Sequence, residues 1–306
     1  MRLDLDDIPE LPAEGAEMGL RPRHHLDLPL AGGRVPLVWC ESGHGRPVLL
    51  LPEPFASVSA SWGMLTALPE SLRALLVETV PLVDAAVKPP GDPTLDSLSK
   101  MLGAVMTALE LERPLLVCEG ALGLAALHLT LDRPASVAGL VLIDCSFEPR
   151  RSPSFLRRMF SRKSSDTRAA RSISRHPVAQ ALAGLAYADP AVVSRLELRE
   201  RAEPLSTVPG ALSFLRWRSW VESPAFAAGL LSELRARAGK PLPVPLRLLF
   251  GERGAPARRA AGEEVARGFP GAEVFVAEQS SHSVHAEKPP WTARIIAEAA
   301  GLSPRS

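Results

Sequence analysis

Residues 115–131 read Leu-Leu-Val-Cys-Glu-Gly-Ala-Leu-Gly-Leu-Ala-Ala-Leu-His-Leu-Thr-Leu, and a second apolar run, Leu-Val-Leu-Ile, follows at 140–143. The stretch opens on an apolar run and makes a tight turn from Cys118 to Gly123, before a helical pattern that ends near Leu131. A strand, a sharp turn, a helix and a second strand in this order form a βαβ unit. We therefore expect a mostly parallel sheet, with the rest of the chain organised around this unit.

The size and charge of the chain limit both its architecture and its partners. With 306 residues, 46% of them hydrophobic, it suits one large α/β domain of roughly 250 residues plus an insertion, or two smaller domains. The 35 Lys and Arg residues nearly balance the 34 Asp and Glu residues, giving a net charge of +1. Because so neutral a molecule has no overall field to attract nucleic acid, we expect no nucleic-acid partner.

The cysteines and short motifs give no support for a metal or a cofactor. Cys40, Cys118 and Cys145 have no C-x-x-C spacing and lie in or beside apolar runs, which predicts reduced, buried thiols. No cluster of His, Cys, Asp or Glu has metal-ligand spacing. Neither G-x-x-x-x-G-K nor G-x-G-x-x-G occurs, so phosphate and dinucleotide binding are not expected.

The charge of the first residues and the length of the apolar segments indicate in which compartment we expect the protein. Residues 1–22 are acidic and contain several prolines, the reverse of a targeting peptide, and they predict a loosely held acidic arm. The longest apolar stretch, 115–131, is interrupted by Glu119 and His128 and fails the requirement of about 18 apolar residues for a membrane span. We therefore expect a cytoplasmic protein.

Strands and helices alternate before the βαβ unit. The expected elements, in chain order, are a hairpin of strands 26–30 and 35–40, a strand 48–51, a short helix 62–68, a strand 75–80 and a helix 94–109. The last of these begins with a helix start signal, Thr94 followed by Asp96 in the first turn. Repeated units of this length predict a parallel sheet covered by helices on both faces.

The pattern changes after Cys145. Residues 146–240 contain no strand-like run but include helical patterns at 177–187 and 211–231. The sheet pattern resumes with a strand 246–250, a helix 257–267, a strand 272–276 and a helix 290–300. An all-helical excursion inside an α/β chain predicts a cap. The expected domains are the arm 1–22, a core formed by 23–145 and 241–306, and a cap at 146–240, inserted after the sixth strand.

The order of elements and several local sequences together resemble the α/β-hydrolase fold superfamily over roughly residues 26–301. The shared pieces are the strand 48–51, Lys88–Asp92, residues 115–129, Gly139–Asp144, Phe250-Gly251-Glu252 and residues 282–289. Members of this family carry Gly-x-Ser-x-Gly at the turn after the fifth strand, called the elbow. They also carry a His-Gly-x-Pro-like loop, an acid after a later strand, and a histidine near the C-terminus.

The resemblance implies a degenerate catalytic triad. The elbow aligns without gaps and places Gly120 at the nucleophile, and a shift by one residue would place Ala121 there. The family's acid position falls on Gly254, so His282 alone is kept. Loss of a serine nucleophile costs on the order of a million-fold in turnover, which excludes an ordinary ester hydrolase. A glycine at the elbow also relieves the backbone strain of that turn.

The loop that supplies the oxyanion hole in the family also departs from the pattern. Pro54 falls where a backbone N–H is expected and has none, whereas Ala121 keeps the other N–H. Phe55 follows in the same loop, and Trp217 and Trp220 are expected on the underside of the cap, as core or as pocket wall.

Several ionisable side chains are candidates for the remaining chemistry. His282 is either a general base or an inherited residue that only fills a hydrogen-bonding position. Glu119, Asp144 and Glu252 lie at predicted strand ends, where an ordinary solvated carboxylate is the more common case. Asp144 is the best of them to orient His282, because some relatives carry the acid after this strand, and Glu148 is weaker. His128 and His285 are assigned to helix and loop surfaces.

Basic residues are concentrated between positions 150 and 175, with nine Arg and Lys residues against Asp166 alone. Apolar residues interleaved at helical spacing would allow this segment to lie on an anionic surface. The simpler interpretation is a mobile lid segment whose arginines are solvated.

Three functions remain open. The first is a non-hydrolytic protein that binds a small hydrophobic molecule between core and cap, and cyclises or isomerises it with His282 as its acid–base group. The second is a pseudoenzyme that serves as an interaction or scaffold protein. The third is a residual hydrolase in which His282, with Asp144, activates water directly.

Overall fold

The computed structural model of the chain describes residues 8, 10, 23–30, 33–87, 94–148, 163–185, 187–189 and 192–302. Most of the predicted acidic arm, the Lys88–Asp92 motif and residues 150–162 of the basic segment lie outside this described part. Of the arm, Ile8 is buried against Val193 and Leu198 of the helical region, and Glu10 pairs with Arg199.

The core is one eight-stranded sheet with the order β1-β2-β4-β3-β5-β6-β7-β8. The first two pairings, β1 with β2 and β2 with β4, are antiparallel, and the others are parallel. The strands are β1 His24–Leu30, β2 Gly33–Ser42, β3 Arg46–Leu51, β4 Leu72–Val77, β5 Leu115–Glu119, β6 Gly139–Ile143, β7 Leu246–Gly251 and β8 Ala272–Ala277. The strand predicted at 75–80 therefore begins and ends three residues earlier.

The central strands are buried on both faces because they consist almost entirely of apolar residues. Side chains alternate across a strand, so Leu49 and Leu51 of β3 join one core cluster while Val48 and Leu50 join the other. β5 and β6 are buried along their whole length. Such continuous apolar runs are typical of parallel strands covered by helices on both sides.

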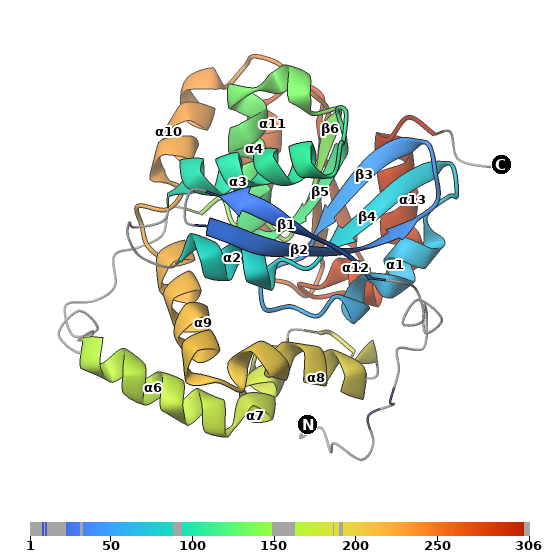
Figure 1. Cartoon of the computed structure of the whole chain (residues 1–306). Helices are drawn as coiled ribbons and strands as arrows, with labels where there is room; N and C mark the ends of the chain where they lie inside the picture. Colours follow the sequence, from blue (N-terminus) through green and yellow to red (C-terminus); the bar gives the residue numbers. More distant parts are fainter. Residues whose placement is uncertain are drawn as a thin grey trace.

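Two layers of helices cover the sheet (Figure 1). One face carries α1 Trp62–Ala67, α12 Val284–Glu287 and α13 Pro289–Ala299, whose apolar side chains join the core cluster that contains Val48 and Leu50. The core cluster that contains Leu49 and Leu51 includes side chains of α2 Val80–Ala86, α3 Leu95–Ala108, α4 Gly120–Asp132 and α11 Pro256–Gly268. As the sequence indicated, Thr94 caps α3, in a capping box with Ser97.

Five helices lie between β6 and β7: α6 Lys163–Arg175, α7 Pro177–Ala183, α8 Arg195–Ala202, α9 Val208–Val221 and α10 Ala228–Arg237. Figure 1 shows α6 to α9 below the carboxyl edge of the sheet. The single helix predicted at 211–231 is wrong, because the chain turns between α9 and α10, where Pro224 lacks the N–H that a continuous helix needs. The helix predicted at 177–187 ends at Ala183, followed by Gly184 at its C-cap.

Short 3-10 turns occur at Ser59–Ser61, Pro134–Ser136 and Glu203–Leu205.

The described helices were also compared with the length and apolarity that a bilayer requires. Among residues 23–302, gaps excepted, no helix combines enough length with enough apolar character to cross a membrane.

Candidate functional site

The elbow joins β5 to α4 at Gly120, which has a φ of 57°. This left-handed conformation costs about 1–3 kcal/mol for a residue with a side chain, and glycine adopts it without that cost. The family's elbow is therefore present in its backbone geometry. What it lacks is the side chain.

The space beside Gly120 is taken by Glu53, which lies on the loop after β3. A Cβ atom added to Gly120 would lie 1.8 Å from Glu53 Oε2, closer than any two such atoms can come. β3 and β5 are neighbours in register, with Leu51 opposite Cys118, so the loop after β3 and the elbow meet at the same edge of the sheet. A carboxyl group from another strand thus stands where the nucleophile's side chain would begin.

Three hydrogen bonds connect Glu53 to the elbow and to the helical region. Ala121 N–H donates to Glu53 Oε2 at 3.1 Å, and Trp217 Nε1–H donates to Oε1 at 3.4 Å. The backbone N–H of Glu53 donates to Glu119 Oε2 at 3.0 Å. The N–H of Ala121 that the sequence identified as the remaining oxyanion donor is therefore already engaged by a carboxyl group of the protein itself.

The surroundings of Glu53 favour its neutral form. Burial, and after it the nearby carboxylate of Glu119, raises the pKa of Glu53 to about 8. The Ala121 N–H, the Trp217 indole and the charge of Arg258 oppose this rise without cancelling it. Near neutral pH the group at the elbow is therefore a carboxylic acid, which can donate a proton.

His282 lies beside Asp144, with His282 Nδ1 and Asp144 Oδ2 2.8 Å apart. Asp144 follows β6 in a left-handed conformation with a φ of 49°, and its side chain is 8% exposed. The imidazole is 30% exposed, so solvent reaches it. When Nδ1–H donates a hydrogen bond to Asp144 Oδ2, Nε2 is the ring nitrogen that is free to accept a proton. Of the four carboxylates considered from the sequence, Asp144 is the one that the structure brings to His282.

Arg258 completes this group from α11. Its guanidinium contacts Asp144 Oδ2 and lies 3.4 Å from His282 Nδ1. The guanidinium thus forms a charge-assisted contact with the same carboxyl oxygen that lies beside the imidazole.

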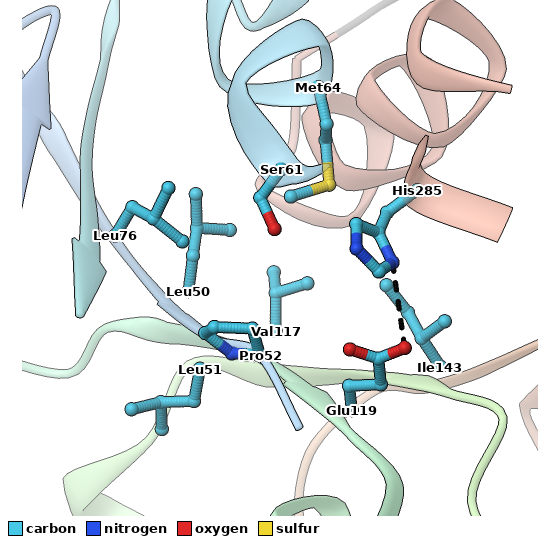
Figure 2. Close-up of a pocket in the computed structure, with 10 residues that line it drawn as sticks. All are labelled: Leu50, Leu51, Pro52, Ser61, Met64, Leu76, Val117, Glu119, Ile143 and His285. Carbon is cyan, nitrogen blue, oxygen red and sulfur yellow. Dashed lines mark ion pairs between the residues drawn. The ribbon is translucent and has the colours of Figure 1, made fainter. Parts of the chain in front are cut away.

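A second histidine–carboxylate pair lies on the other side of the elbow. Figure 2 shows His285 pointing at Glu119, with Nδ1 and Oε1 3.7 Å apart. The assignment of His285 to a surface is wrong, since the residue is 3% exposed and packs under α1 beside Met64 and Ile143. Among the described residues, neither ring nitrogen has a hydrogen-bond partner. The pair borders a cavity of about 10 Å³, room for one water molecule.

The remaining residues considered from the sequence, Glu252, Glu148, Gly254 and Pro54, have no contact with the His282 side chain among those described. Glu252 accepts a hydrogen bond from the N–H of Gln279, and one oxygen of Glu148 is buried without a partner among the described residues. Gly254 lies in the turn after β7, where its N–H bonds to Gly251 O, so the family's acid position carries no carboxylate here. Pro54 is buried in the loop after β3.

Aromatic side chains of the helical region pack against one another and against the loop after β3. Trp217 stacks edge to face with Trp220, and Trp220 with Phe226, at centroid distances of 5.2 and 4.7 Å. Phe55, with a φ of 64°, packs in the same way on Phe214. Besides the small cavity, a larger one of about 330 Å³ lies between α3 and α4 near Arg113. Neither is lined by His282 or the tryptophans, so the ligand cavity beneath them stays a prediction.

The thiols and the acidic side chains of the described part exclude two further kinds of site. Cys40, Cys118 and Cys145 are free and buried, and burial raises the pKa of each thiol, so none is a thiolate nucleophile. No group of three or more His, Cys, Asp or Glu residues in the described part could hold a metal ion.

Sequence reasoning missed Glu53, Arg258 and the burial of His285. Glu53 carried a weak signal, since it lies within the loop that replaces His-Gly-x-Pro and is its single ionisable residue. Arg258 carried none, because it is one of several arginines on an amphipathic helix. His285 follows His282 by three residues, and that spacing does not reveal which face of the sheet each side chain meets.

The comparison with solved structures agrees with this geometry. The chain is similar to the haloalkane dehalogenase DbeA from Bradyrhizobium elkani (TM-score 0.69, 18% identity, 92% of this chain and 98% of that one). It is also similar to the epoxide hydrolase CorEH (0.71, 16%, 92% and 99%) and to a thermophilic esterase from Thermogutta terrifontis (0.65, 18%, 90% and 97%). No family model matches the sequence, and neither does any curated protein.

These similarities extend over nearly the whole chain at identities below one in five, and they show the fold. The prediction of an α/β-hydrolase fold with a helical insertion after the sixth strand is confirmed. The neighbours are described as hydrolases, and what this chain does has to be argued from its own site.

Proposed function

We propose that this α/β-hydrolase-fold protein catalyses a proton transfer on a small, neutral, hydrophobic molecule, without forming a covalent intermediate. The observation that carries the proposal is the contact of His282 Nδ1 with Asp144 Oδ2 at 2.8 Å beside an elbow whose central residue is Gly120. His282 and the carboxylate that orients it, Asp144, are present, whereas Gly120 provides no nucleophile for His282 to deprotonate. Such a base acts on the substrate directly.

The position of His282 supports a catalytic role. Its imidazole is partly exposed at the carboxyl edge of the sheet, the edge at which open α/β sheets bind their ligands. Asp144 and Arg258 fix the ring without covering it. A histidine that merely filled a hydrogen-bonding position would not require a buried, charge-supported carboxylate behind it, because burying such a pair is costly.

The surroundings support a neutral, apolar ligand. Glu53, Glu119 and Asp144 bring three acidic groups to this edge, and the nearby Arg258 is already paired with Asp144. An anionic substrate would meet these acidic groups, and a strongly polar one would meet the aromatic rings of Phe55 and Trp217. A small carbonyl compound with an apolar body fits both conditions.

The test is exchange of the α-protons of cyclohexanone with deuterated water, followed by proton NMR. The wild-type protein should accelerate the exchange, and His282→Ala should remove the acceleration. The matched control is His128→Ala, which removes a partly buried histidine that bonds to Ser99 on the far side of the elbow helix. Equal rates for the wild-type and His282→Ala proteins would overturn the proposal.

A second candidate is an interaction protein that has kept the fold and lost the reaction. It is favoured by one observation, namely that Glu53 already occupies the Ala121 N–H that would bind a developing oxyanion. This function predicts no exchange above buffer and recovery of a defined partner with the purified protein. Recovery of a monomer without a partner, together with exchange that depends on His282, excludes it.

The third candidate, direct activation of water by His282, uses the same residues. It predicts turnover of a simple ester that His282→Ala abolishes. The engaged Ala121 N–H weighs against it, since loss of one oxyanion donor costs roughly a hundred- to thousand-fold in turnover.

A further inference from the structure

Neither the fold nor the proposed role of His282 explains why a glutamate, Glu53, lies in this site. It belongs to the loop after β3, yet its carboxyl group lies against the elbow after β5, where Gly120 leaves it room. A glutamate that served solubility would point to water, whereas this one is enclosed by Ala121, Trp217 and Glu119. The arrangement costs free energy, because a buried carboxyl group gives up its hydration.

We propose that Glu53 is the general acid of the site and that its substrate class is neutral β,γ-unsaturated ketones, which it isomerises together with His282. This inference rests on the proposed function, since it assigns the partner of the same base. It follows from position: the carboxyl group stands at the elbow, at the edge of the sheet that also carries His282 and Asp144.

The hydrogen bonds of Glu53 determine which oxygen donates. Oε2 accepts the 3.1 Å bond from Ala121 N–H, so it is the carbonyl oxygen of the neutral acid. Oε1 receives only the 3.4 Å contact from Trp217 Nε1–H, which leaves it as the hydroxyl oxygen whose proton can be given to a ligand. A neutral carboxylic acid in an apolar site is an established way to donate a hydrogen bond to a developing enolate.

The groups that face Glu53 keep it neutral. Glu119, at the end of β5, raises the pKa of Glu53 after burial, to about 8 in total, whereas the Ala121 N–H of α4, Trp217 of α9 and Arg258 of α11 lower it. Arg258 acts weakly because it is paired with Asp144, which in turn holds His282. The proposed acid and the proposed base thus have separate hydrogen-bond partners.

The reaction balances without a further reactant. His282 Nε2 takes the proton from the carbon between the carbonyl group and the double bond, and the electron pair shifts toward the carbonyl oxygen. That oxygen takes the proton of Glu53 Oε1 and a neutral dienol forms. The imidazolium then returns its proton to the γ-carbon, the enol proton goes back to Glu53, and the conjugated ketone leaves. Both side chains finish as they began.

The chemistry also explains why a ketone is favoured over an epoxide or an ester. Epoxide opening and ester cleavage both need a nucleophile at the elbow, and Gly120 supplies none. An isomerisation needs a base, an acid and an apolar wall. The site offers these in His282, Glu53 and the rings of Phe55 and Trp217.

The experiment uses β,γ-unsaturated cyclohexenone as the probe and follows the ultraviolet absorbance of the conjugated product. Glu53→Gln should lower the rate by about 100-fold or more, the usual contribution of a general acid, while keeping the shape of the side chain. Glu252→Gln is the matched control, since it removes a strand-end carboxylate that accepts a hydrogen bond from the backbone N–H of Gln279. The wild-type rate should fall as pH rises through about 8, and Glu53→Gln should lose this alkaline decline.

The outcomes separate the two proposals. If His282→Ala abolishes conversion and Glu53→Gln converts at the wild-type rate, the role of Glu53 is overturned and the base stands. If the wild-type protein neither exchanges cyclohexanone protons nor converts the probe, both are overturned. A direct measurement does not depend on the variant's folding: carbon NMR of ¹³C-labelled glutamate in the wild-type protein should show Glu53 neutral at pH 6.5. An ionised Glu53 at that pH would overturn its role as the acid.

Discussion

Two histidines three residues apart, His282 and His285, each lie beside a carboxylate, and the two pairs differ in distance, burial and partners. His282 is partly exposed, 2.8 Å from Asp144, and supported by Arg258. His285 is buried, 3.7 Å from Glu119, and without a hydrogen-bond partner in the described part of the protein. Both pairs combine a histidine with a carboxylate, so their different distances and their different access to solvent decide which of them can transfer a proton.

The elbow lies between the two pairs and connects them. Glu53 reaches Ala121 with its carboxyl group and Glu119 with its backbone N–H. Glu119 of the buried pair therefore helps to position Glu53 beside the exposed pair. In the proposed reaction, the exposed pair supplies the base.

The largest expected effect separates the two histidines directly. His282→Gln should lower proton exchange on cyclohexanone by about 100- to 10,000-fold, because it removes the base. His285→Gln should leave exchange within about threefold of wild type, since its buried side chain faces Glu119 and the small cavity, away from the exposed imidazole of His282. Both rates are measured by NMR under identical conditions. A larger loss in His285→Gln than in His282→Gln would reverse the assignment of the two pairs.

Gly120→Ser tests whether the elbow requires a glycine because of Glu53. The new side chain would collide with Glu53 Oε2 and would also adopt a strained φ, for a combined loss of about 2–6 kcal/mol in the free energy of unfolding. Glu53→Ala removes the collision, so the double variant should lose clearly less than the sum of the single losses. Urea unfolding of the four proteins measures this coupling. Additive losses would mean that Glu53 does not occupy the elbow.

The titration of Glu53 predicts how stability changes with pH. Its pKa is raised from 4.5 to about 8 in the folded protein, so the folded state holds a proton that the unfolded state releases in this interval. The contribution of this group to stability should therefore be greatest below about pH 4.5, and it should fall by about 5 kcal/mol as pH rises from about 4.5 to 8. Glu53→Gln should flatten that part of the curve. An identical slope in the variant would show that another group is responsible.

The smallest effect is expected from removing the unpartnered nitrogens of His285. His285→Met keeps an apolar body of similar size, and it removes two ring nitrogens that lack partners among the described residues. The free energy of unfolding should change by less than about 1 kcal/mol, or increase, because an unsatisfied buried polar group is itself destabilising. Thermal unfolding followed by circular dichroism measures it. A loss above about 3 kcal/mol would indicate that a bound water molecule satisfies the imidazole.

Much of the fold could be predicted from the sequence because its signals are local. The apolar runs of β3, β5 and β6, the cap of α3 at Thr94 and the switch to helical patterns after Cys145 each depend on neighbouring residues. The errors occurred where a local pattern had two continuations. The pattern at 211–231 ran across Pro224, at which the chain turns to begin a new helix.

The candidate site was predictable in part. His282 was found by its place in the C-terminal motif, and Asp144 was preferred among carboxylates because of the strand it follows. Glu53 was passed over because a glutamate between two prolines carries no signal of where its side chain goes. The position of His285 could not be found either, because the turn before α12 sends residues three apart to opposite faces.

By itself, the sequence determined the order of strands and helices, the α/β-hydrolase fold, and the absence of a nucleophile at Gly120, since these follow from patterns within short stretches. Only the tertiary structure decided that Glu53 fills the elbow, that Asp144 rather than Glu119 meets His282, and that His285 is sealed beneath α1. The physical reason is that these contacts join segments far apart in the chain. They are set by the register of neighbouring strands and the direction in which each loop leaves the sheet, and no local pattern records either.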